Sequence, residues 1–400
     1  MKKLTKKGLS IFSVLLCTAL TLNTVGFPSA RSVLQAETTS FVPTISATPY
    51  CGEEIKLLDG DILEYASNYK PGKSASYLPV GFGPGNDYRE DDFAPVSMWL
   101  SWQSEKDVQY YTVKISTSPD LSNFVGHITL DTTLELTDLF AGTDYYYQII
   151  AQYAEKTVKS QIFTFRTANL IRTIELEGVS NTRDIGGYYT VDGTKRIRQG
   201  MVYRGAKLEG ITEAGKKKAL DVYGIKTDLD LRGEYYASPL GAGVKYINVS
   251  GPYYTNDANS GKAGIDSLED SSKGPWKGTY RDALIQEIKT FADPANYPIY
   301  VHCSVGRDRT GTIVGLINAL CGVGELDLCM DYEASFFSER GSTSGLWPLE
   351  RLQLFTSVLN YVERYNKDTL AENVEAFMLD IGITAQEIAS IRSILLEEVE

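Results

Sequence analysis

Residues 298–320 read PIYVHCSVGRDRTGTIVGLINAL, and this stretch decides the fold of the second half of the chain. Residues 298–302 form a short apolar run typical of a buried strand. Residues 310–320 are apolar nearly all round, which predicts a buried helix. The loop between them runs from Cys303 to Arg309. Further alternation of strands and helices from about Ile171 onward predicts an α/β domain, with a parallel sheet wrapped in helices on both faces.

The residue types in this loop are suited to binding an anion. Gly306 lets the backbone curl without a Cβ clash, so that the loop amides can turn inward and form a nest for negative charge. The N-terminus of the following helix adds its partial positive charge at the same point. Arg309 offers a planar fork for two phosphate oxygens. The phosphate-binding residues that we expect are Ser304, Val305, Gly306, Arg307, Asp308 and Arg309.

Cys303 lies at the floor of this positive loop and is the expected nucleophile. Such surroundings lower a thiol pKa from about 8.5 to roughly 3.5–7.5. The thiolate would attack phosphorus, while Arg309 and the amides stabilise the transition state, and the Thr310 hydroxyl would ease departure of the sulfur. No metal ion or cofactor is needed. A cysteine before a helix is more often a buried apolar residue, as we expect for Cys321 and Cys329, but the full spacing here is far more specific.

These residues resemble the cysteine-dependent protein tyrosine phosphatase superfamily. The run HCSVGRDRTG at 302–311 resembles, more narrowly, the bacterial tyrosine/lipid phosphatases, whose members hydrolyse phosphotyrosine and often phosphoinositides. The resemblance covers residues 174–398 and includes NTRDIGG at 181–187, YRGAKL at 203–208, the strand end at 228–232, and Asp331-Tyr332 followed by Ser335. Two positions depart from the family pattern: Arg307 replaces a lysine, and Gly205 replaces a serine.

Four further residues are expected to lie around the loop. His302 should order the loop rather than carry a proton. The resemblance places Arg183, Asp184 and Arg204 nearby, although each could equally be a partner in a structural ion pair.

The proton donor to the leaving group is less defined by the sequence. Asp230 lies at the carboxyl end of a predicted strand, where ligands bind in open α/β sheets, and the resemblance also indicates it. Asp308 is the rival, with bracing of the loop through Arg307 as its alternative role. Weaker candidates lie in an expected pocket cover at 253–282: Asp257, Asp266 and Asp270.

The N-terminal half is organised differently. Residues 1–36 carry an early lysine cluster, an apolar stretch at 9–22 and small residues, which predicts a cleaved secretory signal peptide and a secreted protein; an uncleaved anchor is the alternative. Residues 37–90 are expected to be a linker with irregular structure. Residues 91–168 show short strands at regular intervals, which predicts an all-β sandwich. With Trp102 and the segment before its sixth strand, this domain resembles fibronectin type III.

Composition excludes several function classes. The 400 residues include 51 acidic and 39 basic side chains, for a net charge of -12, which argues against a nucleic-acid partner. The chain has 2 histidines, too few for a hydrolase built on several histidine ligands.

The sequence therefore predicts a secreted phosphatase whose catalytic domain occupies residues 171–400 and forms a phosphocysteine intermediate. The expected substrate is a phosphotyrosine protein or a phosphoinositide. Two alternatives stay open: an inositol-phosphate phosphatase of the phytase type, and a non-catalytic binding protein that acts through the sandwich. The sandwich is a candidate binding module for a protein or a glycan.

Overall fold

The structure is a computed structural model that describes residues 43–45, 53–77, 93–104, 106–233, 237–249, 279–338 and 348–399. The chain divides into two compact units. The first contains residues 1–55, 98–136 and 143–166. The second contains residues 56–97, 137–142 and 167–400, so that its chain is interrupted by strands of the first. The predicted signal peptide lies outside the described residues.

The first unit is the predicted all-β sandwich. One antiparallel sheet has the order β1-β2-β5 (Pro43–Ile45, Met98–Trp102, Thr133–Leu136). The other has the order β4-β3-β6-β7, with β8 also paired to β6 (Phe124–Thr129, Tyr110–Ser116, Asp144–Gln152, Thr157–Lys159, Phe163–Arg166). Trp102 of one sheet packs edge-to-face on Tyr111 of the other, with 5.2 Å between ring centroids. The likeness to fibronectin type III stays a prediction.

The second unit contains a five-stranded sheet of order β13-β12-β14-β11-β9 (Lys245–Asn248, Thr227–Asp230, Ile299–His302, Val202–Gly205, Arg183–Asp184). Strands β13, β12, β14 and β11 are mutually parallel, as predicted. The edge strand β9 is antiparallel to β11. A separate two-stranded pairing joins β10 to β15 (Lys195–Ile197, Leu396–Glu398).

Helices cover both faces of this sheet, because the central strand β14 alternates its side chains between two cores. Ile299 and Val301 belong to the core that also contains the apolar side chains of α4. Tyr300 joins a second core with Ala219 of α2. The helices of the unit are α1 (Gly60–Ser67), α2 (Glu213–Asp221), α3 (Thr279–Ala292), α4 (Asp308–Leu320), α5 (Glu325–Ala334), α6 (Pro348–Glu363), α7 (Leu370–Ile381) and α8 (Ala385–Leu395). Short 3-10 turns stand at Ser74–Ser76, Leu208–Gly210, Pro294–Asn296 and Ser335–Phe337.

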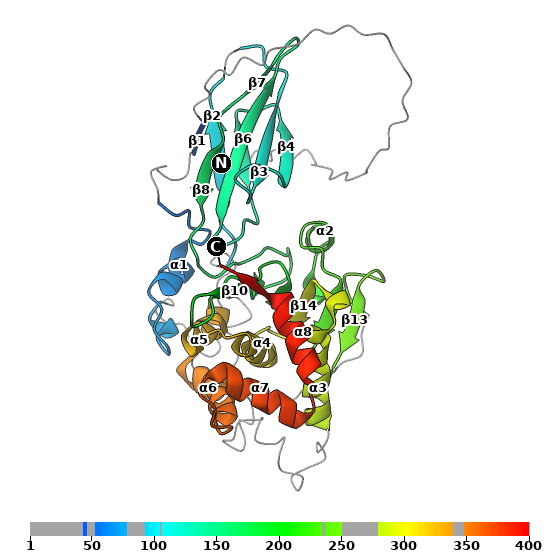
Figure 1. Cartoon of the computed structure of the whole chain (residues 1–400). Coiled ribbons are helices and arrows are strands. Elements are labelled where there is room, and N and C mark those ends of the chain that lie inside the picture. The colour runs from blue at the N-terminus through cyan, green and yellow to red at the C-terminus, as the bar shows by residue number, and fades with distance from the viewer. Residues whose placement is uncertain are drawn as a thin grey trace, which may run out of the picture. The chain divides into compact units, whose positions relative to one another are not determined.

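Helix α4 is the helix predicted from residues 310–320, and all 13 of its residues are buried. It contacts α3, α5, α6 and α7, which surround it in Figure 1. A helix that is apolar all round needs such a position, because no side of it can face water at low cost. Helix α4 begins at Asp308, so that its first two residues are also the last two of the predicted phosphate loop.

Residues 56–77, which we expected to be an irregular linker, instead belong to the second unit. They form α1 and the 3-10 turn at Ser74–Ser76. Ile62 and Tyr65 of α1 are fully buried. The apolar signal in this segment is a single face on one short helix, so composition alone resembled a linker. Within the described residues, none of the helices is both long and apolar enough to cross a bilayer.

The glycine at 205 is explained by its neighbour across the sheet. A Cβ built on Gly205 would lie 2.2 Å from the Tyr300 hydroxyl oxygen. That hydroxyl is buried and donates to the Ala206 carbonyl over 2.7 Å. The Tyr300 hydroxyl therefore occupies the space that a side chain at position 205 would need, which explains why glycine replaces the family's serine there.

We expect Gly205→Ala to lower the stability of the chain by about 1–3 kcal/mol, because the added methyl group would overpack this site. Adding Tyr300→Phe should recover part of the loss by removing the hydroxyl. Thermal unfolding measures both effects. Gly243→Ala is the control, because nothing lies within 4 Å of a Cβ at that position. Equal melting temperatures for Gly205→Ala and Gly243→Ala would contradict the explanation.

Candidate active site

The carbonyl groups of the phosphate loop are held by donors outside it. Lys207 N donates to Ser304 O over 3.3 Å. The Asn181 side-chain amide donates to Val305 O over 2.8 Å. Arg204 donates to Gly306 O over 2.7 Å and to Arg307 O over 3.4 Å.

These four contacts fix where the amides point. In a planar trans peptide, a carbonyl and the following N–H point in opposite directions. With the carbonyls of residues 304–307 turned outward, the amides of residues 305–308 turn toward the inside of the loop. The geometry is that of the anion nest expected from the sequence.

Gly306 allows this path because its φ of +72° lies in the left-handed region. A Cβ on Gly306 would also lie 2.2 Å from the Gly205 carbonyl oxygen. The loop thus passes directly against the backbone at the end of β11, and only glycine fits at that crossing.

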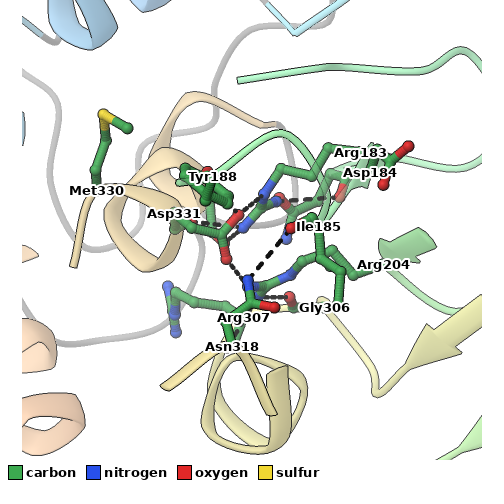
Figure 2. Close-up of polar contacts among 12 residues, drawn as sticks. Arg183, Asp184, Ile185, Tyr188, Arg204, Gly306, Arg307, Asn318, Met330 and Asp331 are labelled. Atoms are coloured by element: carbon green, nitrogen blue, oxygen red, sulfur yellow. Dashed lines mark hydrogen bonds and ion pairs between the residues drawn. The ribbon is translucent and has the colours of Figure 1, made fainter. Parts of the chain in front are cut away.

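Asp331 of α5 holds the two arginines that surround the loop (Figure 2). Arg183 Nε donates to one carboxylate oxygen over 2.8 Å, and Arg204 pairs with the other. Arg183 also donates to the Asn181 side chain, which in turn donates to the loop at Val305. Both arginines are fully buried. Burial by itself raises the pKa of Asp331, but the two arginine charges lower it below its ordinary value.

Cys303 is buried at the end of β14 and carries a free thiol. Burial by itself raises the pKa of this thiol. The Arg309 charge and the polar hydroxyl and amide of Thr310 outweigh that effect, so that the pKa of Cys303 lies below its ordinary value. The geometry therefore favours a thiolate, the nucleophilic form.

The Arg309 side chain is fixed in place by a backbone carbonyl. Its Nη1 donates to Leu231 O, at the end of β12, over 2.7 Å. This contact ties the guanidinium to the carboxyl end of β12, at the edge where the parallel strands end.

His302 lies behind the loop rather than inside it. Its Nε2 is 2.9 Å from an Asp228 oxygen, and its Nδ1 is 3.1 Å from the Cys303 carbonyl oxygen. Burial opposes the charged imidazole, but the Asp228 hydrogen bond and the charges of Asp228 and Asp230 raise the pKa of His302 above its ordinary value. A positive imidazolium next to the cysteine adds to the field that stabilises a thiolate.

Arg307 and Asp308 pair with each other. Arg307 is fully buried and donates to the Asp308 carboxylate through Nε over 3.2 Å and Nη2 over 3.1 Å. The Tyr332 hydroxyl donates to the same carboxylate over 2.8 Å. This is the bracing role that the sequence left open for Asp308.

Asp230 is fully buried and held by Arg232. Arg232 donates to it through its backbone N–H, Nε and Nη2, at 3.0, 2.9 and 2.8 Å, and Tyr246 donates over 3.0 Å. Burial raises the pKa of Asp230, but Arg232 and His302 together lower it below its ordinary value. These contacts favour the ionised form, so Asp230 is poorly suited to donating a proton in this state. The rival positions Asp257, Asp266 and Asp270 lie outside the described residues.

Asp184 does not join the loop network. It pairs with Arg172 over 2.6 Å and accepts hydrogen bonds from the backbone N–H groups of Gly186 and Gly200. It therefore fixes the chain on either side of β9 and fills the structural role that the sequence left open. The sequence placed Asp228 and Arg232 in the strand end at 228–232 without giving either a role, and it did not single out Arg172. The pairing of Asp228 with His302 and of Arg172 with Asp184 arises only in the fold.

The reactivity of the thiols provides a test. Because the pKa of Cys303 is depressed, its thiolate should persist as the pH falls below the ordinary thiol value of about 8.5. Alkylation by iodoacetamide, followed by mass spectrometry across pH 5–9, should give Cys303 a midpoint below that value. Thr310→Val should move the midpoint upward by about one unit, because it removes a hydroxyl that lowers the pKa of Cys303.

Thr312→Val, two residues further along α4, is the matched control and should leave the midpoint unchanged. Cys321 and Cys329, whose pKa burial raises to about 12, should stay unlabelled over the same range. A Cys303 midpoint equal to that of a free thiol would contradict the geometry.

Comparison with known proteins places this site in a family. A family model described as "Tyrosine phosphatase family" matches residues 174–397. The triple specificity protein phosphatase PtpB of Mycobacterium tuberculosis is 24% identical over 253 residues, covering 54% of this chain and 87% of that protein. A Cupriavidus necator protein named as a tyrosine-protein phosphatase is 26% identical over 171 residues, covering 40% of this chain and 61% of that protein.

Among solved structures, the core catalytic domain of the PP-IP phosphatase SIW14 from S. cerevisiae has 18% identity and a TM-score of 0.26, covering 41% of this chain and 88% of that chain. A likeness at that score supports no argument. The chain spans between 31% and 61% of the length of the first curated relatives that it matches. The family model, however, spans more than half of the chain and includes the loop, Asp331 and both buried arginines, and the chain therefore belongs to the tyrosine phosphatase family.

Proposed function

We propose that the chain hydrolyses phosphate monoesters through a phosphocysteine intermediate at Cys303. One observation carries this proposal: a cysteine with a lowered pKa begins a loop whose carbonyls at residues 304–307 are held by donors outside it. Such a site binds a phosphate dianion and presents a nucleophile to it at the same time.

The reaction would proceed in two displacements. The Cys303 thiolate attacks phosphorus, a P–S bond forms, and the ester P–O bond breaks as the leaving oxygen takes up a proton. Water then attacks the phosphocysteine, which releases inorganic phosphate and regenerates the thiolate. The loop amides and Arg309 stabilise the equatorial oxygens in both transition states, and Thr310 stabilises the departing sulfur.

The substrate that we propose is a phosphotyrosine protein or a phosphoinositide. Membership of the tyrosine phosphatase family supports this class. The loop has two arginines, but the Arg307 guanidinium is buried and paired with Asp308. Arg309 is therefore the loop arginine available to the reacting phosphate, which favours a single phosphate over a polyphosphorylated inositol.

We further propose that the protein is exported, on the pattern of residues 1–36. A purely binding role for the sandwich would leave the assembled loop, with its depressed cysteine pKa, unexplained.

The full chain should release phosphate from phosphotyrosine peptides or phosphoinositides with a chelator present. Cys303→Ser should lower kcat by roughly 10⁴-fold or more, because oxygen at that position is a poor nucleophile without a base. The assay compares both substrates with inositol hexakisphosphate. Activity retained in Cys303→Ser, or lost with the chelator, would end the thiolate mechanism. Faster release from inositol hexakisphosphate would select the phytase-type alternative instead.

The role of Asp230 is tested by leaving groups. Because its contacts favour the ionised form, Asp230→Asn should slow activated aryl phosphates and poor alkyl phosphates by similar factors. The kcat/KM values of wild type and variant across a leaving-group series give the comparison. A much larger effect on poor leaving groups would restore Asp230 as the proton donor.

A further inference from the structure

The fully buried carboxylate of Glu333, near the end of α5, is held by a segment far away in sequence. It accepts a hydrogen bond from the Ser74 hydroxyl over 2.6 Å. The Tyr69 hydroxyl donates to it over 2.7 Å, and the Gly72 N–H donates over 3.0 Å. We call these four residues the Glu333 clasp. Its three donors lie well before residue 174, where the match to the family begins.

A buried carboxylate is costly unless its oxygens are hydrogen-bonded. All three donors to Glu333 are neutral, and in the described part of the chain no cationic side chain pairs with it. The segment of residues 56–77 therefore provides the hydrogen bonds that make this buried charge tolerable.

A further hydrogen bond and apolar contacts hold residues 56–77 against α5 and the turn that follows it. The Tyr65 hydroxyl donates to Met330 O over 2.8 Å, and its ring lies 4.7 Å from that of Phe337. Leu58 and Ile62 share one buried cluster with Phe336 and Phe337. In Figure 1, α1 lies beside α5.

Two short routes connect the clasp with the phosphate loop. Asp331, two residues before Glu333, holds Arg204, which donates to Gly306 O over 2.7 Å (Figure 2). The ring of Phe336, in the shared cluster, lies 5.2 Å from the Arg307 guanidinium carbon. Both routes run through α5 and the turn that follows it.

We propose that residues 56–77 are a positioning element of the active site, which acts through the Glu333 clasp to set the place of α5 and thereby of the phosphate loop. The proposal rests on the proposed function, since it is the loop's role in catalysis that gives the position its effect. Ser74, Tyr69 and Glu333 are then positioning residues that never touch substrate.

The test uses the full chain with Tyr69→Phe and Ser74→Ala combined. Losing two donors should lower Tm by about 3–8 °C. Misplacement of the loop should lower kcat about tenfold with KM little changed, and should raise the pH midpoint of Cys303 alkylation. Tyr77→Phe is the matched control: it lies in the same segment, but its hydroxyl donates to Asn68 O at an exposed site. It should change none of the three readings.

A double-mutant cycle isolates the clasp itself. Ser74→Ala alone leaves the carboxylate with one donor fewer, whereas in a Glu333→Gln background no buried charge is left to satisfy. The loss caused by Ser74→Ala should therefore be smaller in that background. This single substitution is also mild enough to keep the chain folded.

A lower Tm with unchanged kcat and unchanged alkylation midpoint would overturn the positioning role. Equal losses from Ser74→Ala in both backgrounds would overturn the clasp. Alkylation of Cys303 needs no turnover, so it reports on the clasp even if Cys303→Ser keeps its activity and the proposed function fails.

Discussion

The active site depends on one carboxylate. Asp331 lies between Arg183 and Arg204, and all three are buried. Arg204 donates directly to the phosphate loop, and Arg183 reaches it through Asn181. Removing one partner of such a buried pair typically costs about 3–5 kcal/mol, because the remaining charge stays without compensation. Here the remaining charges would be two arginines a few ångströms from the loop. The pKa of Arg204 already lies near 10, lowered by burial and by Arg183, which shows how far this cluster relies on its single anion.

That arrangement explains why the loop can present its amides. Backbone carbonyls would compete with the amides for the inside of the loop if they were left free to turn. Asn181 and Arg204 prevent this by donating hydrogen bonds to the carbonyls from the outer side. The positive charge of Arg204 thus acts on the loop backbone rather than on the substrate. The charge that lowers the pKa of the sulfur comes instead from Arg309, and the Asp228 hydrogen bond raises the pKa of His302 behind the loop.

The catalytic unit is assembled from segments that the sequence separates widely. Its sheet and α4 come from the region that matches the family, but residues 56–77 come from before the sandwich. Glu333 links the two with three hydrogen bonds. In this chain the family's core is therefore supplemented by an element that precedes an entire β unit and is hydrogen-bonded to α5.

The sequence by itself determined what short-range patterns encode. The strand, loop and helix at residues 298–320, the parallel sheet, the sandwich strands and the identity of Cys303 and Arg309 all follow from spacing and residue type. Only the tertiary structure decided which side chains pair with residues far away in the sequence. Residues as far apart as Tyr69 and Glu333, or Arg183 and Asp331, meet only because the sheet and α5 bring them together. The same holds for ionisation: Asp230 looked like a free acid at a strand end, but folding buries it and brings His302 of β14 beside it. His302 and the neighbouring Arg232 together favour the carboxylate. Local pattern fixes which groups are present, but the charge state of a buried group depends on neighbours that the chain supplies from elsewhere.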